Sequence, residues 1–339
     1  MTLSGFWHGA AALSARIDLS EALQQPQQLS HLSDRALSMC GVHKRHIQRL
    51  RRSPPLKTPQ PYLTIEQQRY PALLRPIPYA PPVLFYAGNL DRLQDHCVAI
   101  VGARRCTQRA RDLAATLSRE LSGAGLSIVS GLAYGVDEAA HAAAPDQAIA
   151  VLGQGLGATL TQRQRRSIDT ILDAGGLVLS EFLPYFPAAK RTFPQRNRVI
   201  SGLATGTVVI EATLRSGSLV TARHALEQGR EVMAVPGHPL DPMSKGCNQL
   251  IASGAALITS SDDVLSCMGL TQTTHTLPDP ECTQQAQVLN ALNSGETIDH
   301  IAAFTGMDIP TIMVALDGLE LTGHVARLPG DRLQTRTST

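Results

Sequence analysis

Short apolar runs separated by helical patterns fill the middle of this chain and constrain its fold more than any other feature. Stretches of helical spacing, most of them roughly 10 to 18 residues long, lie between the runs. Continuous β-branched and aliphatic runs are typical of strands that are covered on both faces. The alternation predicts an α/β fold with a doubly wound, mostly parallel sheet over about residues 83–265, and ligands of such sheets bind outside the carboxyl ends of the strands. The runs are at residues 83–86, 98–101, 127–129, 148–152, 177–179, 208–210 and 232–235.

The flanking segments predict two smaller domains. Helical spacing without a sheet pattern predicts a small helical, SAM-like domain at residues 1–60, and the proline-rich stretch 51–82 predicts an extended connector over the surface. A polar linker at 271–284 precedes three helical patterns and a Pro-Gly turn at 285–335, which together are similar to a winged helix. Residues 61–270 are then expected to form the domain that contains the sheet, and the family resemblance described below implies that it is an extended Rossmann-like domain.

Composition excludes several classes of protein. The chain has 339 residues, of which 43% are hydrophobic, so several domains with real cores are expected. No apolar run reaches the roughly 18 residues of a membrane span, so a soluble, cytoplasmic protein without membrane contact is expected. The six cysteines contain no CxxC pair, which favours reduced thiols and no metal site.

Charge is distributed unevenly along the chain. The net charge is only +2, but residues 246–326 contain nine acidic residues and no Lys or Arg. Residues 1–245 hold 27 of the 30 basic residues and 18 of the 28 acidic ones, which leaves +9. A basic body of this kind suits a polyanionic ligand.

Glycine-bearing turns follow the first predicted parallel strands. Gly102 and Arg104 come directly after one run, and Ser130, Gly131 and Gly135 follow the next. Backbone N–H groups in such turns can hold an anion, and an arginine can add a charge-assisted contact to phosphate. A dinucleotide fingerprint GxGxxG, followed by an acidic residue after the next strand, is absent, so no nicotinamide or flavin cofactor is expected.

Two arginines and an asparagine precede the central strand. Phe193 and the proline after it favour an extended segment, in which Arg196 and Arg198 would point the same way and Asn197 the opposite way. Two guanidinium groups would then face one anionic target.

A predicted helix start lies on the other side of that strand. Ser216, Gly217 and Ser218 open a helical pattern after the run TVVI at 207–210. Free N–H groups at a helix N-terminus would stabilise phosphate or carboxylate there. The competing interpretation is a solvated arginine pair and an ordinary capping serine.

A catalytic constellation is not evident. Asp137, Glu181 and Glu211 lie at strand or loop ends and could serve as acid or base, although such carboxylates more often cap helices or pair with arginines. The alternative to a binding protein is an enzyme of the nucleotide-phosphoribohydrolase type, but its pattern PGGxGTxxE is absent. A winged-helix transcription factor is a third hypothesis.

Taken in order, six segments closely resemble the DprA/Smf family (DNA processing protein A). They are VAIVGARR, SGLAYGVDEAAH, AVLGQGL, LVLSEF, the stretch from FPQRNR to VPG, and GCNQLIASGAALI. The resemblance implies a Rossmann-like domain that binds single-stranded DNA, forms homodimers and helps load RecA recombinase during natural transformation. It covers roughly residues 62–267, and the C-terminal segment matches the family's layout.

The resemblance also implies site residues. The family's glycine-x-arginine turn falls on Gly102 and Arg104, and its arginine-asparagine-arginine segment on residues 196–198. The Tyr-Pro and lysine usual after AVLGQGL are absent, and Arg163 is the nearest replacement for that charge. The expected nucleic-acid-binding residues are Gly102, Arg104, Ser130, Gly131, Gly135, Arg163, Phe193, Arg196, Asn197, Arg198, Ser216, Gly217 and Ser218.

The third helix of the winged-helix-like segment contrasts with this basic body. It carries Asp317 and Glu320 and no basic residue, so it is not expected to enter a DNA groove. A protein contact is the expected role.

Overall fold

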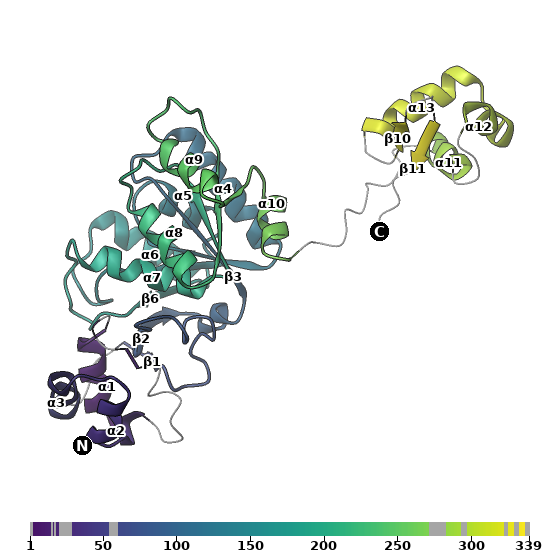
Figure 1. The fold of residues 1–339 in the computed structure, drawn as a ribbon. Helices are drawn as coiled ribbons and strands as arrows, with labels where there is room; N and C mark the ends of the chain where they lie inside the picture. Colours follow the sequence, from purple (N-terminus) through teal and green to yellow (C-terminus); the bar gives the residue numbers. More distant parts are fainter. Residues whose placement is uncertain are drawn as a thin grey trace. The chain divides into compact units, whose positions relative to one another are not determined.

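The chain folds as two units, Met1–Leu270 and Thr271–Thr339 (Figure 1). The computed structural model describes residues 3–14, 16, 18–19, 29–53, 60–270, 283–292, 297–321, 325–328 and 332–335. The described part of the first unit contains the sheet, and that of the second contains three helices and a hairpin.

A nine-stranded sheet of order β1-β2-β6-β5-β4-β3-β7-β8-β9 forms the centre of the first unit. The strands from β6 to β9 are parallel, whereas β2 pairs antiparallel with β6 and β1 antiparallel with β2. The prediction of a doubly wound, mostly parallel sheet is confirmed. The strands are β1 (Tyr62–Thr64), β2 (Val83–Gly88), β3 (His96–Gly102), β4 (Leu126–Ser130), β5 (Ala148–Val151), β6 (Leu177–Ser180), β7 (Gly206–Ile210), β8 (Glu231–Ala234) and β9 (Ala256–Leu257).

Helices cover both faces of this sheet because successive strand residues point to opposite sides. Val98 and Ile100 of β3 pack with α4, α5 and α10, whereas Ala99 and Val101 belong to the core shared with α7, α8 and α9. Side-chain caps fix the starts of α4 and α6, at Thr107 and Thr161. The helices are α4 (Gln108–Gly123), α5 (Val136–Ala143), α6 (Gln162–Asp173), α7 (Thr192–Leu203), α8 (Ser218–Glu227), α9 (Lys245–Ala252) and α10 (Ser261–Cys267).

Chain direction across the sheet reverses between β3 and β7. From β3 the chain moves through β4, β5 and β6 on one side, and then returns to β7 on the other side of β3. The loops after β3 and β7 therefore separate at the carboxyl edge, which is where open α/β sheets form their ligand crevice.

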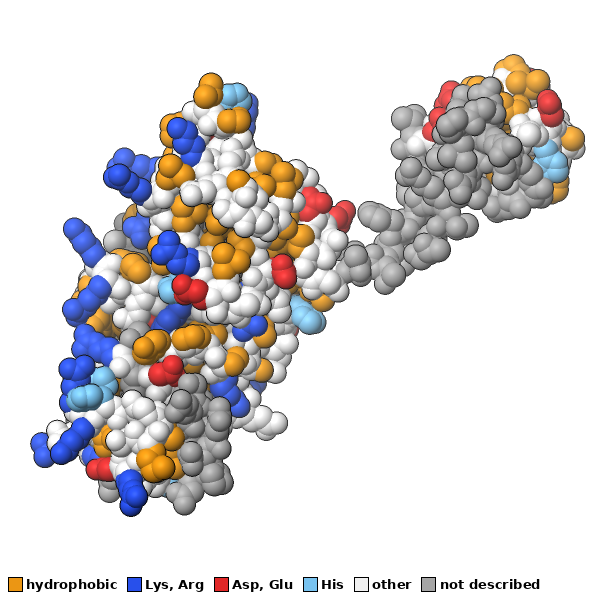
Figure 2. Space-filling view, in the orientation of Figure 1, with side chains coloured by type: hydrophobic (Ala, Val, Ile, Leu, Met, Phe, Trp, Pro, Cys, Tyr) orange, Lys and Arg blue, Asp and Glu red, His pale blue; other side chains and the backbone are white. Residues whose placement is uncertain are grey.

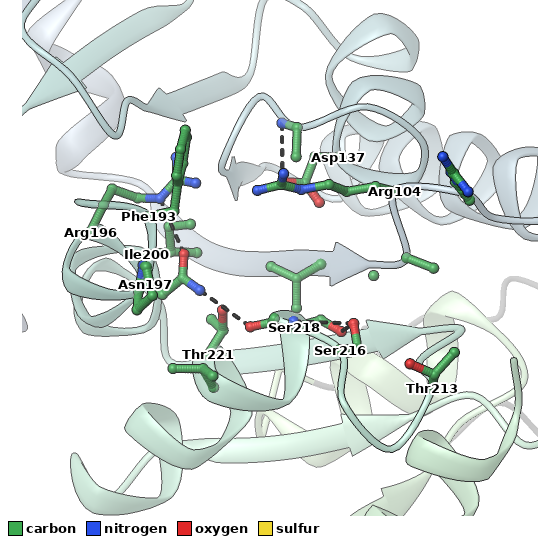
Figure 3. Close-up of a pocket in the computed structure, with 18 of the residues that line it drawn as sticks. Arg104, Asp137, Phe193, Arg196, Asn197, Ile200, Thr213, Ser216, Ser218 and Thr221 are labelled. Atoms are coloured by element: carbon green, nitrogen blue, oxygen red, sulfur yellow. Dashed lines mark hydrogen bonds between the residues drawn. The ribbon is translucent and has the colours of Figure 1, made fainter. Parts of the chain in front are cut away.

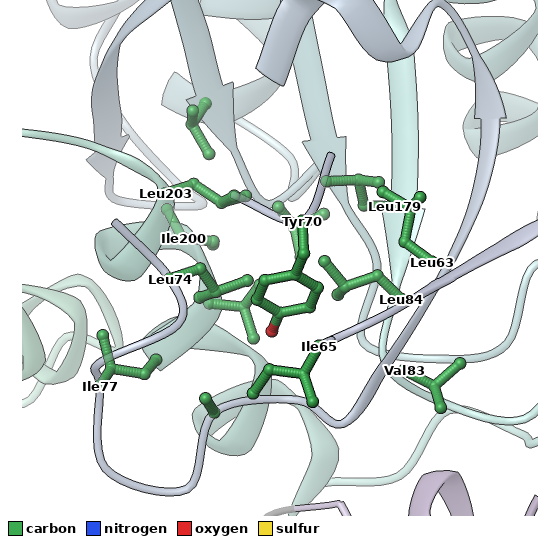
Figure 4. Packing of buried hydrophobic residues seen from close by; sticks show 14 of the residues in the cluster. Leu63, Ile65, Tyr70, Leu74, Ile77, Val83, Leu84, Leu179, Ile200 and Leu203 are labelled. Carbon is green, nitrogen blue, oxygen red and sulfur yellow. The ribbon is translucent and has the colours of Figure 1, made fainter. Parts of the chain in front are cut away.

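The proline-rich stretch is not a surface connector over its described part. Residues 60–82 include β1, and Tyr70, Leu74 and Ile77 are buried against the sheet (Figure 4). The Tyr70 hydroxyl donates a hydrogen bond to the Pro81 carbonyl oxygen at 2.7 Å. The prediction was wrong because the apolar residues that lie between the prolines pack into the core, and proline content alone does not indicate this burial.

The N-terminal helices pack on the same core. Phe6, Leu37 and Leu50 belong to one apolar cluster with β2 and α7. These elements are α1 (Leu3–Ala12), η2 (Leu29–His31), α2 (Asp34–Met39) and α3 (Lys44–Arg52), and the short η3 (Leu90–Leu93) lies between β2 and β3.

The described second unit has the predicted three helices followed by a hairpin. Helices α11 (Thr283–Leu292), α12 (Ile298–Thr305) and α13 (Ile309–Leu321) share a core, and β10 (Val325–Leu328) pairs antiparallel with β11 (Arg332–Thr335). The predicted Pro-Gly turn at 329–330 lies outside the described residues. Among the helices that the structure describes, none alone has the length and apolarity of a membrane span; α12 and Ile309–Glu320 reach them only as a pair bent by 111°.

Candidate nucleic-acid interface

A cavity of about 600 Å³ opens at the carboxyl edge of the sheet, where the loops after β3 and β7 separate. Its walls come from residues 101–105, the first half of α7 and residues 213–221 (Figure 3). The figure shows Arg104 on one side of the cavity and Ser216 and Ser218 on the other. Loops distant in sequence thus converge on one space, as the strand order requires.

Arg104 is one of three exposed cations that line this cavity, with Arg105 and Lys190. Its guanidinium carbon lies 5.3 Å from the centroid of the Phe193 ring, and no ion pair joins it to a carboxylate in the described part of the chain. Stacking on a ring holds a guanidinium in place and contributes about 0.5–1 kcal/mol at an exposed site. The donors of Arg104 therefore remain available to a ligand beside an aromatic face.

Arg196 is buried behind Arg104, with 3% of its surface exposed. It donates hydrogen bonds to the carbonyl oxygen of Gly131, at 2.8 Å, and to that of Val151, so it ties the ends of β4 and β5 together. Burial lowers its pKa to about 10, with Asp137 opposing the shift, so the group stays charged at neutral pH. A side chain at position 131 would lie 2.7 Å from this guanidinium, which explains the glycine there.

Arg198 does not face the cavity. Residues 192–203 form helix α7 rather than an extended segment, because Pro194 occupies the first turn, where a missing N–H costs nothing. Residues two apart on a helix point about 200° apart. Arg198 is 6% exposed and donates to both carboxylate oxygens of Glu181, at 2.8 and 2.7 Å. The expectation that the two guanidinium groups face one target is wrong.

The start of α8 forms the opposite wall of the cavity. Ser216, Gly217 and Ser218 open this helix as predicted; Gly217 is the N-cap, and the Ser216 hydroxyl accepts a hydrogen bond from the Ser218 N–H at 3.3 Å. The hydroxyl groups of Ser216 and Ser218 lie 2.7 Å apart, and Asn197 Nδ2 donates to the Gly217 carbonyl oxygen at 3.3 Å. The N-terminus of α8, an end of a helix that favours negative charge, thus lines the same cavity as Arg104.

Three expected residues shape the turns beneath the cavity. Gly102 lines it, whereas Ser130 is buried and donates to the Ile100 carbonyl oxygen at 2.6 Å. Gly135 has a φ of 85°, and a Cβ there would lie 2.3 Å from the Ala103 carbonyl oxygen. The last two residues therefore hold the loop that carries Arg104, and they do not line the space itself.

Family models decide what this arrangement belongs to. A model of DNA recombination-mediator protein A matches residues 61–269, and a model of the DprA winged helix domain matches residues 272–331. The chain belongs to the DprA family. Protein Smf of Escherichia coli is 36% identical over 334 residues, which cover 91% of this chain and 88% of that protein. DNA processing protein DprA of Streptococcus pneumoniae is 45% identical over 209 residues, covering 61% and 73%.

Solved structures of DprA proteins have the same fold. The crystal structure of DprA from Streptococcus pneumoniae matches with a TM-score of 0.63 and 36% identity, over 78% of this chain and 98% of that one. DprA from Helicobacter pylori, described for its single-stranded DNA binding mode, matches with a TM-score of 0.56 and 30% identity, over 61% and 95%. The DprA winged-helix model matches residues 272–331, so the second unit is a domain found in this family. The hypothesis of a winged-helix transcription factor is not needed to explain it.

Lys190 and Arg105 are cations of the DprA site that the sequence did not single out. Lys190 is exposed, lines the cavity and precedes Phe193 by three residues. Arg163 instead borders another cavity, pairs with Glu138 and lies 4.9 Å over the Tyr134 ring. The sequence signal for Lys190 is a lysine in the loop just before FPQRNR. Position after AVLGQGL instead predicts Arg163 as the binding cation.

A smaller space of about 220 Å³ adjoins the main cavity of this DprA chain. It shares Arg104, Phe193 and Arg196 with the main cavity and adds Tyr134 and Gln154. Phe193 therefore has an aromatic ring bordering both spaces.

The three candidate catalytic carboxylates all have structural partners. Asp137 accepts hydrogen bonds from the Gly131 and Ala133 N–H groups, and burial raises its pKa. Glu181 pairs with Arg198, and Glu211 accepts from the Thr107 N–H at 2.8 Å. DprA membership and these partners leave the phosphoribohydrolase alternative without support. Over the described residues, no group of three or more His, Cys, Asp or Glu side chains is placed to hold a metal ion.

Proposed function

We propose that this DprA protein binds single-stranded DNA at the carboxyl edge of its sheet and processes incoming DNA during natural transformation without catalysing a reaction. The observation that carries the proposal is the convergence of Arg104, Lys190 and the N-terminus of α8 on one cavity with Phe193 in its wall. Cations and N–H groups bind phosphates, and an accessible ring stacks on a base.

An unpaired strand fits this site better than a duplex. A base can stack on the ring of Phe193 only when it is free of its partner strand. The Arg104 guanidinium, 5.3 Å from the centroid of this ring, lies beside the same position and can contact the neighbouring phosphate. Stacking of this kind tolerates any base and contributes about 1–3 kcal/mol per base. The proposed ligand is therefore a single strand without strong sequence preference.

Titration of a labelled oligothymidylate tests this proposal by fluorescence anisotropy. Arg104→Ala and Lys190→Ala are expected to weaken binding and to lower the salt slope by about 0.7 per lost phosphate contact. Arg163→Ala, which removes an exposed arginine paired with Glu138, serves as the matched control. Folded wild-type protein that fails to bind the oligonucleotide at low salt would overturn the proposal.

Partner proteins follow from the family and are proposed with it. We infer a homodimer formed through the Rossmann-like domain, transfer of the strand to RecA recombinase, and action in the cytoplasm. In this domain the side chain of Leu240 is 81% exposed and so is accessible to a partner. The acidic α13 of the second unit suits a protein partner better than DNA. Sedimentation of wild type and Leu240→Glu would test the dimer.

A further inference from the structure

The N-terminal helix α3 presents an exposed, strongly basic face. Its sequence KRHIQRLRR contains five Lys or Arg residues and no acidic one. Ile47 and Leu50 are buried, which turns Lys44, Arg45 and Arg49 outward. Over the described ranges these three cations form no ion pair with a carboxylate, whereas Arg51 of the same helix pairs with Asp34. A surface of this kind fits a polyanion.

The end of α1 brings this face close to the DNA cavity. Ser14 follows α1, and its carbonyl oxygen accepts a hydrogen bond from Gln195 Nε2 of α7 at 3.3 Å. Arg191 lies one helical turn before Gln195, directly after the cavity residue Lys190, and is exposed. Ser14, just after α1, therefore contacts α7 within one helical turn of Arg191.

Arg16 is a further exposed cation on the N-terminal side of this contact. It is exposed two residues after Ser14. Burial and then the charges of Arg45, His43, Arg16 and Arg49 lower the pKa of His46 in α3, so Arg16 is within electrostatic range of that helix. Figure 2 shows Lys and Arg side chains over the N-terminal helices and farther along the same edge of the first unit. We call Arg191, Arg16, Arg45 and Arg49 the basic path.

We propose that a DNA strand leaving the cavity continues along the basic path, which makes the N-terminal helical domain a second part of the DNA-binding surface. This inference rests on the proposed function. The nine residues of α3 include no Phe, Tyr or Trp, so its contacts are to phosphates and are independent of base sequence. A longer strand reaches more cations than a short one that ends inside the cavity.

Strand length separates the two parts of the surface. We would measure the affinity of the full chain for oligothymidylates of roughly 6 and roughly 20 nucleotides, one near the lower end of the roughly 4–16 nucleotides that single-strand-binding modules cover and one above it. Arg45→Glu and Arg49→Glu are each expected to weaken binding of the long oligonucleotide and to make its salt slope shallower by about 0.7. Binding of the short one is expected to stay at the wild-type value.

Arg119→Glu is the charge-matched control. Arg119 is exposed near the end of α4, next to the start of β4 and so at the opposite edge of the sheet from the cavity. The proposal is overturned if the α3 variants bind the long oligonucleotide like wild type, since the face would then serve another polyanion such as an acidic protein. Equal loss with both lengths, or the same loss in Arg119→Glu, also overturns it. Wild-type protein that binds neither length contradicts the proposed function instead.

Discussion

Replacing Arg198 is expected to destabilise the first unit while leaving its DNA affinity unchanged. Arg198 and Glu181 are 6% and 1% exposed and form a two-point ion pair in the core. Arg198→Ala leaves the Glu181 carboxylate buried without its partner, and breaking a buried pair in this way costs about 3–5 kcal/mol. Loss of a large fraction of a typical domain's stability would follow.

Urea denaturation of the variant, followed by fluorescence, measures this loss of unfolding free energy. The double variant Arg198→Met, Glu181→Leu is the control, because it removes both charges and keeps apolar volume. It is expected to recover most of the loss. Anisotropy of the folded fraction should give wild-type affinity. Normal stability with weakened DNA binding in Arg198→Ala would refute the reasoning and return Arg198 to the binding surface.

Other side chains of the first unit give further tests. Gly131→Ala forces a methyl group against the Arg196 guanidinium and should lower the unfolding free energy by about 1–3 kcal/mol, measured by thermal denaturation; an unchanged melting temperature would contradict the tight fit. Burial lowers the pKa of His141 to about 4 from 6.5, so its contribution to stability is present above pH 6.5 and is lost as pH falls towards 4. The loss is about 3 kcal/mol. The unfolding free energy, measured by urea titration at several pH values, should therefore fall more steeply with decreasing pH in wild type than in His141→Gln. Phe193→Ala should weaken oligonucleotide binding by about 1–3 kcal/mol in anisotropy, whereas Phe193→Tyr should bind normally; equal loss in both would argue against stacking.

Much of the sheet could be predicted from the sequence because its signals are local. The buried strands are continuous apolar runs, and the turns after β3 and β4 carry glycines that their packing requires. The position of Arg104 at a strand end follows from the same pattern. Sheet order then brings Arg104 and the start of α8 together, as the parallel connection predicts.

Local signals failed where two of them competed. Pro194 favours an extended residue before it, but proline is also accepted in the first turn of a helix, where its missing N–H would have no partner within the helix. Arg196 and Arg198 would point the same way in an extended segment, whereas in helix α7 they point to different sides. Lys190 was missed because its role depends on where α7 starts, which the sequence alone did not establish.

The contact between Ser14 and α7 has a practical consequence for anyone trimming this protein. Ser14 hydroxyl donates to Glu181, and the same helix that carries Arg198 on one side presents Phe193 and Asn197 to the cavity. A shortened version that begins at β1 would expose this joint to water and release one flank of α7. Measurements on such a fragment would therefore describe an altered scaffold, and point substitutions in the intact polypeptide are the cleaner instrument.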